Sequence, residues 1–367
     1  MERIGIDARL TYYRQGGISQ MIYHLIKELP HIDPAHDYVI LHSRKDTRDL
    51  TTGPNQRRAI CWTPAHHRLE RIALAVETLP LRLDLLHSPD FIPPIDLGPK
   101  SVITIHDLTF LHYPDFLTKE SRRYYNGQID AAVARADHII TDSEATRQDV
   151  LSLLGAAPDK VTTVWLGLDP HFAPATADAI SALCDRYALH KGYILFVGTF
   201  EPRKNLPGLL RAYASLSADA PQLVIAGRQG WLTDEIHALA AELRVGQRVV
   251  WLEDVPYADL PALYSGASVL CLPSFYEGFG FPPLEAMACG TPVVVANRAS
   301  LPEIVGDAAV LVAPDSPESI AEGIMSVLSD ETFSAALRER GRKRAQLFDW
   351  RETTRRVHAI YEQVLST

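Results

Sequence analysis

The sequence has few cysteines, and none of them lies close to another. The 4 cysteines are Cys61, Cys184, Cys271 and Cys289, and no C-x-x-C pair occurs. This spacing argues against a zinc site built on cysteine and against a framework of disulfides. It is typical of a reducing compartment, so we expect a cytoplasmic protein whose fold is held together by its apolar core.

The sequence also has fewer basic than acidic residues. Lys and Arg number 36 against 45 Asp and Glu, which gives a net charge of −9. A protein that covers nucleic acid needs a basic surface, so we expect no nucleic-acid partner.

Long hydrophobic runs are absent as well. Glu2, Arg3 and Asp7 interrupt the N-terminus, so there is no room there for the apolar region of a signal peptide. The longest uncharged run, residues 260–276, contains prolines and a glycine and is a poor membrane span. Any membrane contact is therefore expected to be peripheral, at the inner face of the membrane.

The chain does have the composition of a globular protein with more than one core. Its 367 residues exceed one ordinary hydrophobic core, and 47% of them are apolar against 22% charged. This composition excludes disordered and fibrous classes. We therefore expect two compact domains.

Short β-branched runs alternate with longer amphipathic stretches in both halves, which is typical of βαβ units with parallel sheets. The series breaks between Asp169 and Gly192. We therefore place a first domain at 1–170, a linker at 171–191 and a second domain at 192–349. The predicted strands are residues 3–6, 38–41, 102–105, 138–141, 193–197, 222–226, 248–252, 269–272 and 292–295.

Loops directly after such strands are where chemistry is expected, because the carboxyl ends of parallel strands open toward a crevice. Gly16 and Gly17 open a helix predicted to end at Leu29, and backbone N–H groups there can meet a phosphate. A plain glycine turn is the alternative. His106 follows another strand and could orient a sugar hydroxyl or transfer a proton. A core histidine bonded to the backbone is the alternative there.

A pair of adjacent cations follows the first strand of the second half. Arg203 offers a planar fork and Lys204 a point charge, and the two together suit a diphosphate. A solvated surface pair is the alternative. The sequence contains neither G-x-x-x-x-G-K-[ST] nor G-x-G-x-x-G, so P-loop and dinucleotide sites have no motif behind them.

The fourth loop carries two carboxylates, Glu277 and Glu285, with glycines, prolines and aromatics between them. Pro283 and Gly290 predict a short helix that starts beside Glu285 and stops at Cys289. Carboxylates accept hydrogen bonds from sugar and ribose hydroxyls, so both are expected to face one bound molecule. A solvated turn is the bland alternative. The backbone amides expected to contact a phosphate or sugar are those of Phe279, Gly280 and Phe281.

The segment E-G-F-G-F-P-P-L-E-A-M-A-C-G resembles the retaining nucleotide-sugar glycosyltransferases of family GT4, which have the GT-B fold. Other segments resemble the family in the same order, among them I-G-I-D-A-R, T-I-H-D, D-L-P-A-L-Y and L-P-E. The form G-T-F-E-P-R-K-N is most similar to bacterial polysaccharide and O-antigen mannosyltransferases. The resemblance implies two Rossmann-like domains with parallel sheets facing an interdomain cleft, and a terminal helix, 350–367, that returns to the first domain.

The resemblance also implies roles for single residues. Arg203 and Lys204 would hold the donor diphosphate, Glu285 the nucleotide ribose and Glu277 the transferring sugar. His106 would meet the sugar and the reacting centre, with Gly16 and Gly17 over the phosphates. Three places depart from the family pattern: Thr199 stands where many relatives have Arg, L-G-L-D at 166–169 stands where N-G-V-D is common, and Glu253 stands where a glycine is common.

The implied reaction is retaining, metal-independent transfer of a hexose, mannose from GDP-mannose, without a cofactor. The acceptor would be a saccharide or lipid-linked saccharide in cell-surface polysaccharide synthesis. A UDP-sugar or GDP-fucose donor, a nucleotide-sugar epimerase of the same fold and a non-catalytic sugar-nucleotide binding protein remain alternatives. The cations and tyrosines of residues 119–125 predict either a contact with anionic lipid or a solvated helix with its tyrosines packed inward.

Overall fold

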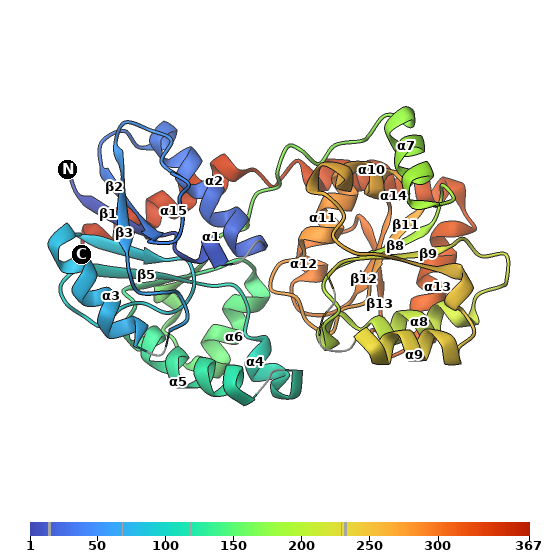
Figure 1. Cartoon of the computed structure of the whole chain (residues 1–367), viewed down its shortest axis with the longest axis horizontal. Coiled ribbons are helices and arrows are strands. Elements are labelled where there is room, and N and C mark those ends of the chain that lie inside the picture. The colour runs from blue at the N-terminus through green and yellow to red at the C-terminus, as the bar shows by residue number, and fades with distance from the viewer. Residues whose placement is uncertain (14–15, 68, 117–118, 229, 231–232) are drawn as a thin grey trace. The chain divides into compact units, whose positions relative to one another are not determined.

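The computed structural model describes residues 1–13, 16–67, 69–116, 119–228, 230 and 233–367, without the side chains of 119–124 and 126. The chain forms two compact units. The first comprises Met1–Gly167 and Phe348–Thr367, and the second comprises Leu168–Leu347. Figure 1 shows that each unit is a parallel sheet with helices on both faces.

The first unit contains a seven-stranded sheet in the order β3-β2-β1-β4-β5-β6-β7, and every pairing in it is parallel. Its strands are β1 (Arg3–Asp7), β2 (Asp37–Ser43), β3 (Gln56–Cys61), β4 (Leu85–Ser88), β5 (Lys100–Ile105), β6 (His138–Thr141) and β7 (Val161–Thr163). Its helices are α1 (Leu10–Tyr13), α2 (Gly17–Ile32), α3 (Glu70–Thr78), α4 (Thr109–His112), α5 (Lys119–Arg135), α6 (Glu144–Leu154) and α15 (Trp350–Leu365).

The second unit contains a six-stranded parallel sheet in the order β10-β9-β8-β11-β12-β13. Its strands are β8 (Ile194–Val197), β9 (Leu223–Ala226), β10 (Val249–Leu252), β11 (Val269–Leu272), β12 (Val293–Ala296) and β13 (Ala309–Val312). Its helices are α7 (Ala177–Tyr187), α8 (Leu206–Ser215), α9 (Thr233–Glu242), α10 (Leu260–Gly266), α11 (Phe281–Ala288), α12 (Leu301–Val305), α13 (Pro317–Leu328) and α14 (Glu331–Ala345).

The segment that we expected to be a linker, residues 171–191, belongs to the second unit instead. Its helix α7 buries Ile180 and Leu183, and it packs against α10. The backbone N–H of Gly192 then donates to the carbonyl of Gly266. The segment breaks the alternation of strands and helices because it is one extra helix on the second domain.

The sequence missed four strands, β3, β4, β7 and β13. β7 has 3 residues and β4 and β13 have 4 each. β3 forms one edge of its sheet and carries Arg57 and Arg58, so it lacks the apolar run that marks a buried strand. Most of the recognised strands are central and buried, although β10 forms an edge of its sheet.

Helix α2 was expected to end at Leu29 but continues to Ile32 with Pro30 inside it. A proline in a helix leaves the carbonyl four residues earlier without its N–H partner. Here the carbonyl of Ile26 accepts from Nε2 of Gln56 at 2.6 Å and from the Thr52 hydroxyl at 3.3 Å. These side chains replace the lost hydrogen bond, so the helix survives its proline.

The C-terminal helix α15 completes the core of the first unit. Asp349 caps it by accepting from the N–H of Arg351 at 2.9 Å. Val357, Ile360, Tyr361 and Val364 of α15 join the same core cluster as α2 and the central strands. In the described part of the chain, no helix is long and apolar enough to cross a membrane.

We predict that Gly167→Ala destabilises the first unit by about 1–3 kcal/mol, because a Cβ there would lie 2.3 Å from the backbone nitrogen of Trp350. The N-terminus of α15 would have to shift. Gly127→Ala is the matched control, since nothing lies within 4 Å of its Cβ and alanine favours the helix. Urea unfolding would measure both. Equal midpoints for Gly167→Ala and wild type would contradict the prediction.

Candidate active site

The fourth loop and its helix have a shape that the glycines and prolines dictate. β11 runs into a loop that ends at Gly280, whose φ of 116° is unfavourable for other residues and whose Cβ would lie 2.9 Å from Leu301. Pro282 and Pro283 sit in the first turn of α11 and lack N–H groups. The first turn of α11 therefore has an N–H group only at Phe281, directly after Phe279 and Gly280.

The other end of α11 closes as the sequence predicted. Gly290 has a φ of 79° and donates to the carbonyl of Met287, while Thr291 donates to that of Ala286. This pair of hydrogen bonds is a Schellman motif with Gly290 at the C′ position. The start of the helix was predicted too late, because it begins at Phe281 and Glu285 lies in its second turn.

Glu277 lies at the centre of a buried cluster of charges. Its Oε1 accepts from Nζ of Lys204 at 2.6 Å and from the Ser274 hydroxyl at 2.7 Å. Its Oε2 accepts from Nη1 of Arg203 at 2.7 Å. The Glu277 and Lys204 side chains are only 7% and 8% exposed. The solvated-surface alternative for the cation pair is therefore wrong, at least for Lys204.

Burial opposes the charge on Glu277, but the ammonium of Lys204 and the guanidinium of Arg203 lower its pKa to about 2. The Glu277 carboxyl group is thus ionised at neutral pH. A carboxylate offers about four lone-pair sites, and the three bonds above leave room for one further donor. The arrangement can hold a hydroxyl of a bound sugar on the carboxylate while the two cations hold an anion.

The loop that carries the cations is fixed by Asn205. This residue adopts a φ of 56° and caps α8 by accepting from the N–H of Gly208. Its amide nitrogen donates to the carbonyls of Pro273 and Pro314 at 3.1 and 2.7 Å. One side chain therefore joins the cation loop to the loop that contains Glu277.

Glu285 points from α11 to the hydroxyl of Tyr264 on α10, which donates to it at 2.5 Å. Burial, together with the charge of Asp169, raises the pKa of Glu285 to about 7 despite this hydrogen bond. A buried carboxyl group with few donors gains by meeting hydroxyl groups of a ligand. Glu285 has the chemistry needed for a ribose diol.

His106 and the glycine pair lie in the first unit. Nδ1 of His106 is 2.6 Å from the Asp142 carboxylate and Nε2 is 2.7 Å from the carbonyl of Pro89. Although burial opposes the charge, Asp142 raises the pKa of His106 to about 9. Both acceptors require an N–H, so His106 is an imidazolium that donates to the protein. In this arrangement it supplies positive charge and has no nitrogen that accepts a proton.

Gly16 and Gly17 stand at the N-terminus of α2. Gly16 is exposed and has extended backbone, and nothing lies within 4 Å of where its Cβ would be. The fold itself therefore makes no steric demand for glycine at this position. An approaching ligand would supply that demand, which fits the expectation of phosphate contact.

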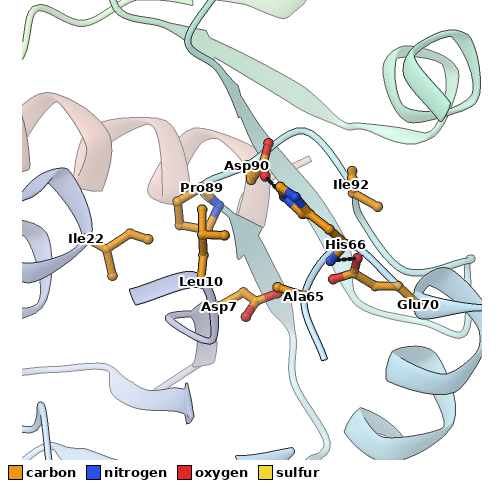
Figure 2. Close-up of a pocket in the computed structure, with 9 residues that line it drawn as sticks. All are labelled: Asp7, Leu10, Ile22, Ala65, His66, Glu70, Pro89, Asp90 and Ile92. Atoms are coloured by element: carbon orange, nitrogen blue, oxygen red, sulfur yellow. Dashed lines mark hydrogen bonds and ion pairs between the residues drawn. The ribbon is translucent and has the colours of Figure 1, made fainter. Parts of the chain in front are cut away.

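The first unit also contains a pocket with three carboxylates (Figure 2). Nε2 of His66 is 2.5 Å from Asp90, and the backbone N–H of His66 donates to Glu70 at 2.7 Å. Asp7 lies across the pocket and forms an ion pair with the buried Arg9, which also contacts Glu70. The pocket is lined by Asp7, Leu10, Ile22, Ala65, His66, Glu70, Pro89, Asp90 and Ile92.

This pocket was not predicted from the sequence. Two hydrogen-bond partners of predicted site residues, Asp142 and Tyr264, were not predicted either. Pro89 and Asp90 follow β4, which was not among the predicted strands, and Asp142 follows β6 directly. Asp142 could have been found by searching the loop after every predicted strand. Tyr264, the partner of Glu285, carries no such signal because it comes from a separate helix.

Residues 119–125 give a partial answer to the question of lipid contact. The side chains of 119–124 lie outside the described residues. The ring of Tyr125 packs against Phe91 and Phe110, with centroids 5.7 and 5.5 Å away. Tyr125 therefore faces the core, as the alternative of a helix with inward tyrosines requires.

Models of known protein families match the sequence in both halves of the chain. Residues 15–172 match the model of Glycosyltransferase Family 4, and residues 188–344 match that of Glycosyl transferases group 1. O-antigen chain mannosyltransferase B of Escherichia coli is 35% identical over 285 residues, which cover 76% of this chain and 74% of the relative.

A second relative is longer than this chain. The serotype-specific mannosyltransferase WbdA of Escherichia coli is 31% identical over 276 residues, which cover 71% of this chain but only 33% of WbdA. The chain thus matches about a third of that protein.

The fold agrees with solved glycosyltransferase structures. Sucrose-phosphate synthase of Thermosynechococcus elongatus superposes with a TM-score of 0.81 at 22% identity, over 100% of both chains. Anabaena Alr3699/HepE, solved in complex with UDP and glucose, gives a TM-score of 0.78 at 18% identity, over 99% of this chain and 100% of that one. Sequence and fold together place the chain in glycosyltransferase family 4, with the GT-B fold.

Proposed function

We propose that this chain is a retaining mannosyltransferase that moves mannose from GDP-mannose to a saccharide or lipid-linked saccharide in cell-surface polysaccharide synthesis. The observation that carries the proposal is the buried cluster of Arg203, Lys204 and Glu277. The two O-antigen and serotype-specific mannosyltransferases among the relatives support the choice of sugar and pathway. With a lipid-linked acceptor, the protein would work peripherally at the inner face of the membrane.

In this proposal the donor binds to the second unit. Arg203 and Lys204 hold the diphosphate. Glu277 accepts a hydrogen bond from a hydroxyl of the transferring sugar through its remaining lone pair. Glu285 accepts hydrogen bonds from the ribose hydroxyls. The backbone amides of Phe279, Gly280 and Phe281 donate hydrogen bonds to the phosphate or sugar. The ion pairs to Glu277 keep both cations in place before the donor arrives.

The reaction needs stabilisation of the departing diphosphate more than any other help. The bond from the anomeric carbon to the phosphate oxygen breaks, and a bond to the acceptor oxygen forms on the same face. The acceptor proton passes to the leaving phosphate oxygen. Lys204, Arg203 and the N-terminus of α11 stabilise the negative charge that develops there, so we propose that no metal ion or cofactor takes part.

The acceptor is proposed to bind the carboxylate pocket of the first unit. Asp7, Glu70 and Asp90 can accept sugar hydroxyls, and the His106 imidazolium behind Pro89 balances part of their charge. Gly16 and Gly17 would lie over the donor phosphates. Three carboxylates repel an anion, so the accepting sugar is proposed to be neutral rather than phosphorylated or carboxylated.

We predict that GDP raises the thermal unfolding midpoint of the second unit more than UDP or ADP does. A ligand at 100 times its Kd contributes about 2.7 kcal/mol, which is roughly 5–10 °C for a unit of this size. Lys204→Ala should lose the shift, measured against its own ligand-free midpoint, because the main diphosphate contact is gone. Lys343→Ala, with a side chain 72% exposed, is the matched control.

The outcomes of that experiment separate the alternatives for the donor. A larger shift with UDP would refute the GDP-sugar donor, and no shift with any nucleotide would refute the donor site. Conversion of the nucleotide-sugar without acceptor would indicate an epimerase instead. A wild-type protein that binds GDP but transfers no sugar to any acceptor would be a binding protein.

We predict that affinity for GDP-mannose rises about tenfold between pH 6 and pH 8. Ribose hydroxyls donate to the ionised form of Glu285, and its pKa of about 7 means that the carboxyl loses its proton across this range. GDP-mannose has no phosphate that titrates there. Glu285→Gln should bind more weakly and with a flat profile in isothermal calorimetry. A profile in the variant as steep as that of wild type would rule out Glu285 as the cause.

We predict that the Glu285 carboxyl group also makes the stability of the ligand-free protein depend on pH. The pKa of Glu285 is higher in the folded chain than in the unfolded chain, so the folded state retains a proton that the unfolded state loses. Its contribution to stability is therefore present below about pH 4.5 and is lost as pH rises toward 7. Glu285→Gln should weaken this pH dependence.

We predict that Asp90→Asn raises KM for a neutral acceptor about tenfold and leaves KM for the donor unchanged. A hydrogen bond to a charged group is worth about 1.5–3 kcal/mol, and the amide supplies a weaker acceptor of the same shape. Asp96→Asn, whose side chain is 69% exposed, is the control. Steady-state kinetics would measure both constants. An unchanged acceptor KM, or an equal rise in donor KM, would contradict the assignment of the pocket.

A further inference from the structure

A cluster of histidines and carboxylates joins the C-terminal helix to the end of α2, away from the residues discussed so far. Asp33 caps α2, His36 lies in the loop before β2, and His358 and Glu362 are one turn apart on α15. The ligand atoms of Asp33, His36 and His358 all lie within 4.8 Å of one another. Their side chains are 5%, 14% and 20% exposed.

The loop from Asp33 to His36 is held rigidly. Oδ1 of Asp33 accepts from the N–H of Ala35 at 2.8 Å, and the Asn55 amide donates to the carbonyls of Asp33 and His36 at 2.9 and 3.0 Å. Tyr38 donates to Oδ2 of Asp33 at 2.7 Å. The positions of these groups are thus fixed before any ligand binds, which favours binding.

The interatomic distances match the edges of a small coordination polyhedron. A tetrahedral zinc ion with bonds of about 2.0–2.2 Å separates its ligand atoms by about 3.3–3.6 Å. Nε2 of His358 lies 3.3 Å from Oδ2 of Asp33, and Nδ1 of His36 lies 2.8 Å from the same oxygen. A small widening of the second distance would place an ion between the three atoms.

Two further features favour a cation. Nε2 of His358 is shielded from solvent and has no hydrogen-bond partner among the described residues. Asp33 is a carboxylate held in place by hydrogen bonds from Tyr38 and Ala35, and carboxylate oxygens are zinc ligands. Nε2 of His36 lies 3.4 Å from Glu362, which can accept its proton and orient the ring.

We propose that Asp33, His36 and His358 bind a divalent transition metal ion of the zinc class, with Glu362 as the outer carboxylate of His36. Asp33 would bind through Oδ2, His36 through Nδ1 and His358 through Nε2, and water would complete the shell. The Nδ1 proton of His36 leaves on binding, and its Nε2–H donates to Glu362. The ion would fasten α15 to α2 and stabilise the first unit, with no part in sugar transfer.

The test uses the full chain, freed of metal with EDTA and then titrated with ZnCl2. Calorimetry should show one equivalent bound with a Kd that His36→Ala and His358→Ala each raise at least tenfold. At 100 times the Kd, Zn²⁺ should raise the unfolding midpoint of the first unit by roughly 5–10 °C. Mg²⁺ should give no shift, because it prefers oxygen ligands. Co²⁺ should give the visible absorption of a low-coordinate ion.

His31→Ala is the matched control, because His31 is exposed in the last turn of α2 and outside the cluster. It should bind Zn²⁺ as wild type does. Should an alanine variant unfold, His36→Gln replaces it, since glutamine keeps a polar side chain. Unchanged zinc affinity in the cluster variants would overturn the proposal, and so would a wild type that binds none. The variants could also lose stability although zinc does not change the unfolding midpoint of wild type. That result would show that the cluster stabilises the unit by hydrogen bonds alone, and it would also overturn the proposal.

The same preparation separates this proposal from that for sugar transfer. EDTA should lower the unfolding midpoint while leaving turnover at 25 °C intact. A loss of turnover that Mg²⁺ or Mn²⁺ restores would instead overturn the metal-independent mechanism. GDP binding to the second unit does not depend on either result.

Discussion

The ion pairs of Glu277 are the constraint on which the second unit depends. Taking an ammonium and a carboxylate out of water costs several kcal/mol each, and close pairing with additional hydrogen bonds must offset that cost. Lys204, Arg203 and Ser274 together provide this pairing and hydrogen bonding for Glu277. The loops after β8 and β11 therefore cannot move independently, and Asn205 adds a second connection between them. Removing one partner would leave a buried charge uncompensated, at a cost of about 3–5 kcal/mol.

The first unit handles its charges differently. Several of its acids pair with histidine or arginine: Asp142 with His106, Asp90 with His66, and Asp7 with Arg9. Arg9 is 1% exposed and bridges two carboxylates. Such pairs hold acceptor oxygens in fixed positions without an excess of positive charge. This pattern suits recognition of neutral hydroxyl groups, whereas the paired cations of the second unit suit a phosphate.

The sequence predicts the class of fold well, and it marks Arg203, Lys204 and Glu277, which the structure joins in one buried cluster, because both depend on local patterns. Central strands such as β6 and β11 are continuous apolar runs, and Gly280 and Gly290 mark the ends of a helix by their backbone requirements. Arg203 and Lys204 are adjacent in sequence. Their pairing with Glu277, 73 and 74 positions away, was not predicted, although the motif that contains Glu277 was recognised.

What the sequence could not show are features built from distant segments. The pocket combines Asp7 at the end of β1 with residues that follow β3 and β4, and β4 was not among the predicted strands. The continuation of α2 past Pro30 depends on Gln56, which lies 30 positions from the carbonyl that it satisfies. Prediction from composition and period has no access to such contacts, because each depends on where the completed sheet places a loop.

The balance of charge at Glu277 has a consequence for the proposed reaction. Arg203 also pairs with Glu201 at 2.8 Å, so the two cations and two carboxylates carry no net charge, and a diphosphate adds two negative charges. A diphosphate therefore competes with Glu277 for Lys204 and Arg203. As the cations turn toward the phosphates, lone pairs of Glu277 become available to sugar hydroxyls next to the anomeric carbon. In the proposed reaction, the Glu277 carboxylate would then bind the sugar, so that one group would both position the phosphate contacts and orient the group that is transferred.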